Sequence, residues 1–323
     1  MRDTSRDDLR SDPDIPSEIR YDPDLAVHEP ARVPEGPSEP SRRRSPLLLF
    51  PLGLLLLVLG VYLLFGLIAN ERHSASDYLD EIGMGGGHAW EAAFELSRLL
   101  GSETPARDDT RFLPRLLTLF EAARGGDPRV RQYLAIGLGE VGDRRAVEAL
   151  LGAVDDGDLQ TRINATLALG RLGDARAAPG ILPLLDSDEP DLRKAAAYAL
   201  GGLEAAESRG PLEALLNDPV EDVAWNAALA LARRGDAAGL PLIARMLDRR
   251  YLEGVARPDE AGRPVPLGEM QKEEAMINAM RSLVALRERS QEATLKRLRG
   301  SDPSLRVRQA ALDALADLAA APH

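Results

Sequence analysis

The residue types that most often carry out catalysis or bind metals are scarce in this chain of 323 residues. It contains no cysteine, which excludes disulfides, thiolate metal sites and cysteine nucleophiles. The four histidines lie outside the regularly patterned part of the chain: His28, His73, His88 and His323. A zinc site or a catalytic triad needs such groups to converge. We therefore expect no enzymatic activity, no metal, no cofactor and no small-molecule substrate.

Carboxylates are plentiful, and one cluster has the composition of a calcium site. Asp155, Asp156 and Asp158 lie close together in the sequence. They lack the twelve-residue loop with a final bidentate glutamate that an EF-hand uses. We predict a solvated turn at these residues and no bound cation.

Arginine side chains recur at a fixed spacing. Arg131, Arg162 and Arg193 follow one another at a constant interval, and Arg308 occupies an equivalent place near the end of the chain. Such a series could bind an anionic ligand, but guanidinium groups more often bridge to carboxylates or to helix C-terminal carbonyls. We predict that these arginines connect neighbouring structural units.

The same interval governs the apolar residues that must position these side chains. Four leucines share one register: Leu138, Leu169, Leu200 and Leu231. A fixed period of about 30 residues is typical of a solenoid, in which each unit buries its apolar face only by stacking on the next. The sequence therefore predicts stacked repeats, an architecture that favours binding over catalysis.

The unit at 127–154 shows the internal pattern most clearly. Asp127 suits an N-cap and Pro128 suits the first helical position. Apolar residues then form one helical stripe: Val130, Leu134, Leu138 and Val141. Gly142 suits the left-handed residue that ends a helix, and Asp143 suits the N-cap of the next. Each unit is thus predicted to be a helix, a tight turn and a second helix.

Similar units follow along the chain, starting at Asp158, Glu189 and Asp218. A divergent unit precedes them at 89–123, another pair is predicted at 275–298, and a last unpaired helix starts near Asp302. The unit from Glu189 has the residues 204–206 in place of a Gly-Asp turn, which predicts a longer or looser turn. We predict an all-α fold, an α-solenoid of about six helix pairs over 88–323.

The pattern DPxVRxxAxxALGxLGDxxAxxxLxxxL, at Asp127–Leu150 and again at Asp158–Leu182, resembles the short HEAT repeat of the PBS-lyase-like type. The resemblance covers roughly 88–318 and is more specific for fold than for function. It implies a right-handed α-solenoid whose concave face, formed mainly by second helices, binds proteins. Some relatives are lyases that act on bilin chromophores, and only the shared repeat points to that activity here.

The period fails at one place. The interval from Asn226 to the next residue in register, Asn278, is too long, so a segment is inserted within 249–274. Prolines and glycines predict a loop without helix, and insertions in solenoids often lie on the binding face. The candidate partner-binding residues are Arg249, Arg250, Tyr251, Arg257 and Arg263. The alternative is a tolerated surface insertion. If it binds a partner, deletion of 251–268 abolishes complex formation and leaves the helical melting transition intact.

The overall charge limits the class of partner. The net charge is -12, the pI is near 5.0 and aromatic residues make up 4% of the chain. A nucleic-acid-binding solenoid needs a basic face for phosphates or aromatic side chains for bases. We therefore expect protein partners and no nucleic acid.

Three segments precede the predicted solenoid. Residues 1–45, rich in charged residues and proline, are predicted to be a disordered tail. Residues 46–70 carry no charge, and their apolar run would span about 35 Å as a helix, enough to cross a hydrocarbon core of about 30 Å. We predict one transmembrane helix there. Residues 71–87 are predicted to be a juxtamembrane linker with a brief helix over 74–82 and a glycine hinge at 83–87.

Charges beside the predicted span indicate its orientation. Arg42, Arg43 and Arg44 stand before it, whereas Arg72 is outnumbered by acidic residues after it. The positive-inside rule then places the N-terminus in the cytoplasm. The excess of arginine over lysine favours a bacterial source, so we expect the solenoid on the periplasmic or external side of the inner membrane.

These features favour a membrane-anchored scaffold or assembly factor that binds a protein partner, itself membrane-associated, through the solenoid. One alternative is a HEAT-type lyase or chaperone for a chromophore or cofactor. Another is an accessory subunit of a membrane transporter or respiratory complex.

Overall fold

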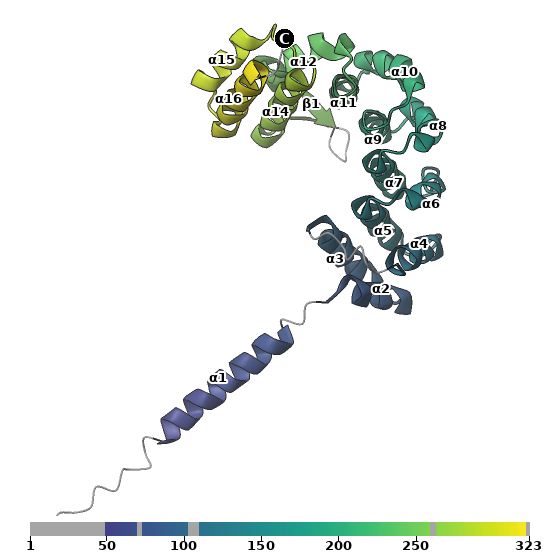
Figure 1. The fold of residues 1–323 in the computed structure, drawn as a ribbon, viewed down its shortest axis with the longest axis vertical. Helices are drawn as coiled ribbons and strands as arrows, with labels where there is room; N and C mark the ends of the chain where they lie inside the picture. Colours follow the sequence, from purple (N-terminus) through teal and green to yellow (C-terminus); the bar gives the residue numbers. More distant parts are fainter. Residues whose placement is uncertain (1–48, 70–72, 103–109, 259–262, 321–323) are drawn as a thin grey trace, which may run out of the picture. The chain divides into compact units, whose positions relative to one another are not determined.

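A computed structural model describes residues 49–69, 73–102, 110–258 and 263–320 (Figure 1). The chain forms two compact units, 1–70 and 71–323. The tail predicted at 1–45 lies outside the described residues.

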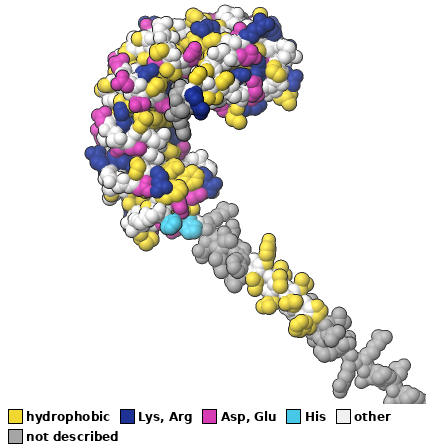
Figure 2. All heavy atoms as spheres, turned by 180° about the vertical axis from the view of Figure 1, so that it is seen from behind, with side chains coloured by type: hydrophobic (Ala, Val, Ile, Leu, Met, Phe, Trp, Pro, Cys, Tyr) yellow, Lys and Arg dark blue, Asp and Glu magenta, His cyan; other side chains and the backbone are white. Residues whose placement is uncertain are grey.

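The first unit contributes one helix, α1 (Leu49–Ala69). Its described side chains, at 50, 51 and 53–63, are all exposed, and the coloured side chains of this helix in Figure 2 are hydrophobic. Among the residues that the structure describes, no helix combines the length and apolar character needed to cross a membrane. The transmembrane helix expected at 46–70 therefore stays a prediction.

The second unit is a stack of helix pairs. The pairs are α3 (Ala89–Ser102) with α4 (Phe112–Ala122), α5 (Pro128–Val141) with α6 (Val147–Leu151), α7 (Leu159–Leu172) with α8 (Ala178–Ile181), α9 (Pro190–Leu200) with α10 (Arg209–Ala214), α11 (Glu221–Arg233) with α12 (Leu240–Met246), and α14 (Glu269–Ala285) with α15 (Glu292–Ser301). The helix α16 (Leu305–Ala320) ends the stack. The all-α repeat solenoid predicted from the period is confirmed over the described residues.

Short 3-10 turns extend the second helices. They are η2 (Arg144–Ala146), η3 (Ala175–Ala177), η4 (Leu182–Asp186), η5 (Ala206–Ser208), η6 (Leu215–Asn217) and η7 (Ala237–Gly239). Because these turns take up part of each second segment, the second helices α6, α8, α10 and α12 are shorter than the first helices of their pairs.

The predicted caps form as expected. The Asp127 side chain accepts a hydrogen bond from the backbone N–H of Arg129 at the start of α5. Gly142 and Gly173 end α5 and α7 with φ of 70° and 62°, a conformation that glycine adopts without steric cost. Asp143 and Asp174 then cap the 3-10 turns that follow. These four positions fix the tight turn inside each of two units.

The unit that lacks the Gly-Asp turn is closed by its neighbour. The α9 helix ends at Leu200, and its chain turns through 201–205 before η5. Arg234 of the next unit donates to the carbonyls of Leu203 and Ala205, at 2.7 Å each, and to Ser208 Oγ at 2.9 Å. A guanidinium thus holds the turn that a glycine closes elsewhere.

The segment predicted to be a linker contains a packed helix. α2 (Ala75–Met84) starts at a capping box made by Ser74 and Asp77. Its Leu79 and Ile82 are buried in the same hydrophobic cluster as α3. Gly85 and Gly86, with φ of 72° and 99°, make the turn between these two packed helices.

The insertion folds into regular structure, so the prediction of a loop without helix is wrong. It contains α13 (Arg249–Glu253) and two antiparallel strands, β1 (Ala256–Pro258) and β2 (Pro264–Pro266). Asp248 caps α13 by accepting from the backbone N–H of Arg250. Leu252, Val255 and Leu267 are buried, which gives the segment an apolar anchor that its glycines and prolines conceal in the sequence.

The solenoid has two hydrophobic clusters. One extends from Leu79 to Leu231, and the other from Trp225 to Leu318. α11 contributes to both, since Val223 belongs to the first cluster and Trp225 to the second. The second cluster includes the buried residues of the insertion.

Candidate binding groove

The concave side of the solenoid is formed by the first helices of the pairs. In Figure 1, α5, α7, α9 and α11 lie on the inner side of the curve, and α6, α8 and α10 lie on the outer side. The first helices approach closely because glycine meets alanine: a Cβ added to Gly170 would lie 2.5 Å from Ala199 Cα, and one added to Gly201 2.7 Å from Ala230 Cα. The expectation that second helices form the concave face is therefore wrong. The first helices form it, and they carry the small residues that close spacing on the inner side requires.

A groove of about 520 Å³ lies on this side. It is lined by residues of α7, α9, α11 and α14, together with Met246 of α12 and Arg257 of β1. Among its apolar side chains, Leu167 is 36% exposed and Tyr198 is 42% exposed. Large exposed apolar side chains grouped on one surface are typical of a site that another molecule covers.

Three of the apolar lining residues share the repeat register. Leu167, Tyr198 and Leu229 are separated by the repeat interval and come from α7, α9 and α11. Sequence reasoning missed them because each belongs to the same amphipathic pattern as the core leucines. The signal that could have found them is a second register of large residues, offset from the leucines at 169, 200 and 231.

Amide side chains supply the polar part of the groove. Gln160, Asn226, Gln271 and Asn278 all line it. Asn226 Nδ2 donates to the Asp222 carbonyl at 2.8 Å, and Gln160 Nε2 donates to Asn164 Oδ1 at 2.8 Å. Among the described residues, the acceptor oxygens of these two amides have no partner, so they stay available to a ligand.

Four of the five charged residues in the groove form ion pairs, one pair within α9 and one between α11 and β1. Lys194 Nζ lies 2.6 Å from Asp191 Oδ1. Arg257 Nη2 donates to Asp222 Oδ1 at 2.6 Å. Glu274 is exposed and has no ion-pair partner among the described residues. The groove therefore carries one uncompensated negative charge.

The insertion builds part of the groove. Tyr251 of α13 lies behind Trp225, whose indole Nε1 donates to the Tyr251 hydroxyl at 3.0 Å. The two rings meet edge to face, with centroids 6.2 Å apart, and the Arg245 guanidinium lies 4.3 Å from the Tyr251 ring centroid. Together with the pair of Arg257 and Asp222, these contacts fix the insertion against α11.

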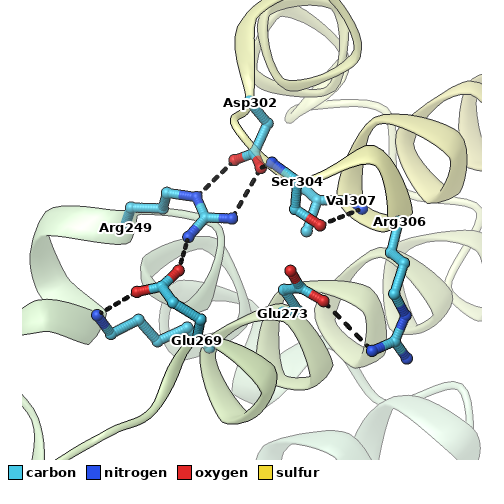
Figure 3. A network of polar contacts seen from close by, with 8 residues as sticks. Arg249, Glu269, Glu273, Asp302, Ser304, Arg306 and Val307 are labelled. Atoms are coloured by element: carbon cyan, nitrogen blue, oxygen red, sulfur yellow. Dashed lines mark hydrogen bonds and ion pairs between the residues drawn. The ribbon is translucent and has the colours of Figure 1, made fainter.

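Arg249 has a structural role. It donates to both carboxylate oxygens of Asp302, at 2.7 and 2.8 Å, and to Glu269 at 2.9 Å (Figure 3). The hydrogen bonds that Arg249 donates to these carboxylates raise its pKa above the usual arginine value. The Asp302 side chain is only 1% exposed. Arg249 thus connects α13 to α14 and to the turn before α16, next to a second pair, Arg306 with Glu273.

The structure separates the five predicted partner-binding residues. Arg257 and Tyr251 lie at or directly behind the groove, Arg249 is engaged by two carboxylates, and Arg250 and Arg263 are exposed. Partner binding by these residues stays a prediction. Deletion of 251–268 would also remove Leu252, Val255 and Leu267 from the second cluster, so we expect the deletion to lower the stability of the part of the solenoid that they anchor.

Three of the periodic arginines, at 131, 162 and 193, connect neighbouring units, as predicted. Arg131, 2% exposed, lies 2.8 Å from Asp156 and donates to the Phe120 carbonyl at 2.8 Å. Arg193 donates to both oxygens of Asp218, at 2.8 and 3.0 Å, and this carboxylate raises the pKa of Arg193.

Arg162 differs from these two because Ser187 stands at the position where Arg131 and Arg193 each find an aspartate of the next unit. It donates instead to the Val154 carbonyl at 3.1 Å. No anion site is needed to explain these three side chains.

The acidic cluster and the described histidines also have structural contacts. Asp156 pairs with Arg131, and Asp158 accepts from the Thr161 backbone and from Gln132, at 2.8 Å each. His73 stacks on Tyr78, and His88 lies 3.2 Å from Glu91. In the described part of the chain, no group of histidine and carboxylate side chains is arranged to hold a metal ion.

A family model for HEAT repeats matches residues 116–200 and 178–256. No curated protein matches the chain. Among solved structures, the complex of CpcE and CpcF of phycocyanin lyase from Nostoc sp. PCC7120 is 19% identical, with 77% of this chain and 96% of that chain covered and a TM-score of 0.52.

Two further structures have lower TM-scores. The archaeal HEAT-like repeats protein from Thermococcus onnurineus NA1 is 16% identical, with 77% and 98% covered and a TM-score of 0.40. Human deoxyhypusine hydroxylase is 19% identical, with 83% and 99% covered and a TM-score of 0.33. At these identities the likeness concerns the fold. Together with the stacked helix pairs and their Gly-Asp turns, the family match shows that residues 116–256 of this solenoid are HEAT repeats.

Proposed function

We propose that the solenoid holds a protein partner in its concave groove and acts as a scaffold or assembly factor. The observation that carries this proposal is the composition of the groove. Exposed Leu167 and Tyr198 lie there among amide oxygens that have no partner within the described part of the chain, beside the carboxylate of Glu274. Apolar anchors surrounded by polar groups are typical of protein interfaces. The two-chain complex of CpcE and CpcF, which has a similar fold, supports a protein as the ligand.

Site-specific photocrosslinking tests this function. A photoreactive amino acid at Tyr198 should capture a partner in cells, because that side chain is exposed in the groove. The matched control is Leu312, which is 44% exposed on α16 and does not line the groove. Equal capture from both positions, or capture from Leu312 alone, would contradict the assignment of the groove.

A second candidate function is that of a lyase or chaperone for a chromophore or cofactor. The likeness to the phycocyanin lyase complex favours it at the level of fold. Incubation of the purified chain with a free bilin should then give a shifted visible absorption band, and Tyr198→Ala should remove it. An unchanged bilin spectrum would contradict this second function and leave protein binding as the remaining candidate.

We also propose that α1 anchors the solenoid to a membrane. The support is its row of exposed apolar side chains, such as Phe50, Leu55 and Leu63, and the three arginines before it in the sequence. The chain should stay in the membrane fraction after a high-salt wash, and a reporter active only in the cytoplasm should fail when fused after His323. A chain that salt removes from membranes would contradict the anchor.

A further inference from the structure

We infer that the groove binds an extended, basic segment of its partner, with an apolar side chain at every third position. This inference rests on the proposed protein-binding function and adds the conformation and charge of the ligand. Three observations carry it: the spacing of the apolar side chains, the unpaired amides and the single uncompensated charge.

The first observation is that the groove repeats once per helix pair. Leu167, Tyr198 and Leu229 occupy one register on three successive first helices. These helices are in direct contact, since an added Cβ at Gly170 or Gly201 would clash with the next helix, and packed helices lie about 8–10 Å apart. An extended polyproline-type segment repeats every three residues, about 9.3 Å. Its side chains at every third position therefore match the apolar register, whereas a β-strand would offer a side chain on one face about every 6.6 Å.

The second observation separates an extended segment from a helical one. A helical ligand satisfies its own backbone N–H and C=O groups, whereas an extended segment presents them unpaired. The groove offers side chains suited to those groups, since the acceptor oxygens of Gln160 and Asn226 are unpaired among the described residues. Asn278, which accepts from Arg281 at 3.4 Å, keeps its Nδ2 donor unpaired within the same part of the chain. Amides that both donate and accept are the side chains that pair with a peptide backbone.

The third observation is charge. Two ion pairs, Lys194 with Asp191 and Arg257 with Asp222, neutralise most of the groove and leave Glu274. Acidic and basic side chains are interspersed on the face shown in Figure 2, while the whole chain is acidic, with a net charge of -12. A lysine or arginine on the segment would pair with Glu274, and a carboxylate placed beside Glu274 would be repelled.

Selection from random peptides tests all three features at once. The full chain, kept in mild detergent because of the exposed side chains of α1, is used to select from a phage library of short random peptides. The double variant Leu167→Ala, Tyr198→Ala serves for counter-selection, because both side chains are exposed and their truncation leaves the buried core intact. The peptides enriched on the wild type should have apolar residues at every third position, tolerate proline and carry lysine or arginine.

An enriched peptide is then synthesised and its binding measured by fluorescence. Trp90 and Trp225 are the only tryptophans of the chain, so Trp90→Phe leaves one reporter in the groove. We expect Tyr198→Ala or the double change Asn226→Ala, Asn278→Ala to weaken binding about tenfold, and Glu274→Gln about threefold. The matched control Leu312→Ala should leave binding unchanged.

Three results would overturn the inference. They are enriched peptides with the helical spacing of three, four and seven, enriched peptides that are acidic, and no enrichment over the counter-selected variant. Each result leaves the photocrosslinking test of the proposed function standing, so the two failures can be distinguished. Capture of a partner at Tyr198 together with helical peptides would keep the scaffold and replace the extended ligand by a helix.

Discussion

The regular repeats from α5 to α12 and the insertion at 249–268 are held together in different ways. In the repeats the same contact recurs at the same sequence interval, since Arg131 meets Asp156 and Arg193 meets Asp218. In the described part of the insertion, Arg249 pairs with Asp302 and Glu269, and Arg257 pairs with Asp222, and these pairs do not follow the repeat interval. Repeats are therefore stabilised by neighbours, whereas the insertion depends on the tertiary arrangement of three distant elements.

This difference explains where the groove acquires its specific features. Regular packing gives each first helix a similar inner face, and the exposed residues at 167, 198 and 229 follow from it. The insertion adds what the repeat does not contain, namely Tyr251 behind Trp225 and Arg257 across from Asp222. The break in the period thus shapes the groove and stabilises the end of the solenoid at once.

The largest expected effect comes from Arg249. In Arg249→Ala the buried carboxylate of Asp302 loses the guanidinium that contacts both of its oxygens. Loss of one partner of a buried ion pair costs about 3 kcal/mol. Urea unfolding followed by far-UV circular dichroism should show this decrease in the free energy of unfolding.

Arg250 provides the matched control for that experiment. It is the next residue on the same helix and is exposed, so Arg250→Ala should change the stability by less than about 0.5 kcal/mol. If both variants unfold at the same urea concentration, the insertion does not depend on its contact with Asp302.

A second, smaller effect tests the close spacing of the repeats. Gly170→Ala places a Cβ 2.5 Å from Ala199 Cα, so α7 and α9 must move apart. Overpacking of this kind costs about 1–3 kcal/mol, against a helix preference for alanine of about 1 kcal/mol. We expect a net decrease in the free energy of unfolding.

The control for this change has the opposite expected sign. Gly300 lies in α15, and an added Cβ there would meet nothing within 4 Å. Gly300→Ala should therefore stabilise the chain by up to about 1 kcal/mol. A destabilised Gly300→Ala, or a stabilised Gly170→Ala, would show that the small residues do not set the inner spacing.

A third prediction concerns the contact between the insertion and α11. Tyr251→Phe removes the hydroxyl that accepts from Trp225 Nε1, which leaves a buried N–H without its partner. The expected cost is about 1 kcal/mol, with a changed emission of Trp225 measured in the Trp90→Phe background. Tyr133→Phe is the control, because Tyr133 makes a ring contact with Phe94 and its hydroxyl has no hydrogen-bond partner among the described residues. An unchanged Trp225 emission would argue against the observed contact.

The sequence predicted the repeats well because their rules are local. An N-cap at Asp127, a left-handed glycine at 142 and a constant spacing of leucines each act within one turn or one unit. Where a repeat departs from the pattern, a distant residue compensates, as Arg234 does for the turn at 201–205. That compensation could not be seen from the turn sequence itself.

The candidate site was predicted less completely for the same reason. The break in the period indicates partner binding by the arginines of the insertion, because insertions in solenoids often lie on the binding face. Arg249 departs from this rule through the distant carboxylate of Asp302, which no local pattern indicates. Tyr198 and Trp225 are both aromatic residues on first helices. In the structure, Tyr198 is exposed in the groove, whereas Trp225 is buried against Tyr251.

The smallest expected effect is the pH dependence of the aspartate caps in the regular repeats. Hydrogen bonds from Arg176 lower the pKa of Asp174 to about 2, and Arg209 of the preceding unit lowers the pKa of Asp236. An unfolded aspartate titrates near pH 3.9. Since the folded pKa is depressed, the stability from these caps is present above about pH 4 and is lost as the pH falls toward 2.

In Asp174→Asn the melting temperature should therefore be lower than in the wild type at pH 6, and the two should converge near pH 2. Arg250→Ala again serves as the control, with no difference at either pH. A constant difference between Asp174→Asn and the wild type over this range would mean that the cap acts by its shape and not by its charge. Convergence would mean that acid destabilises the regular repeats by protonating the capping aspartates. Each Gly-Asp turn has one such aspartate, so the loss of stability is small for one cap and adds up over the series of caps.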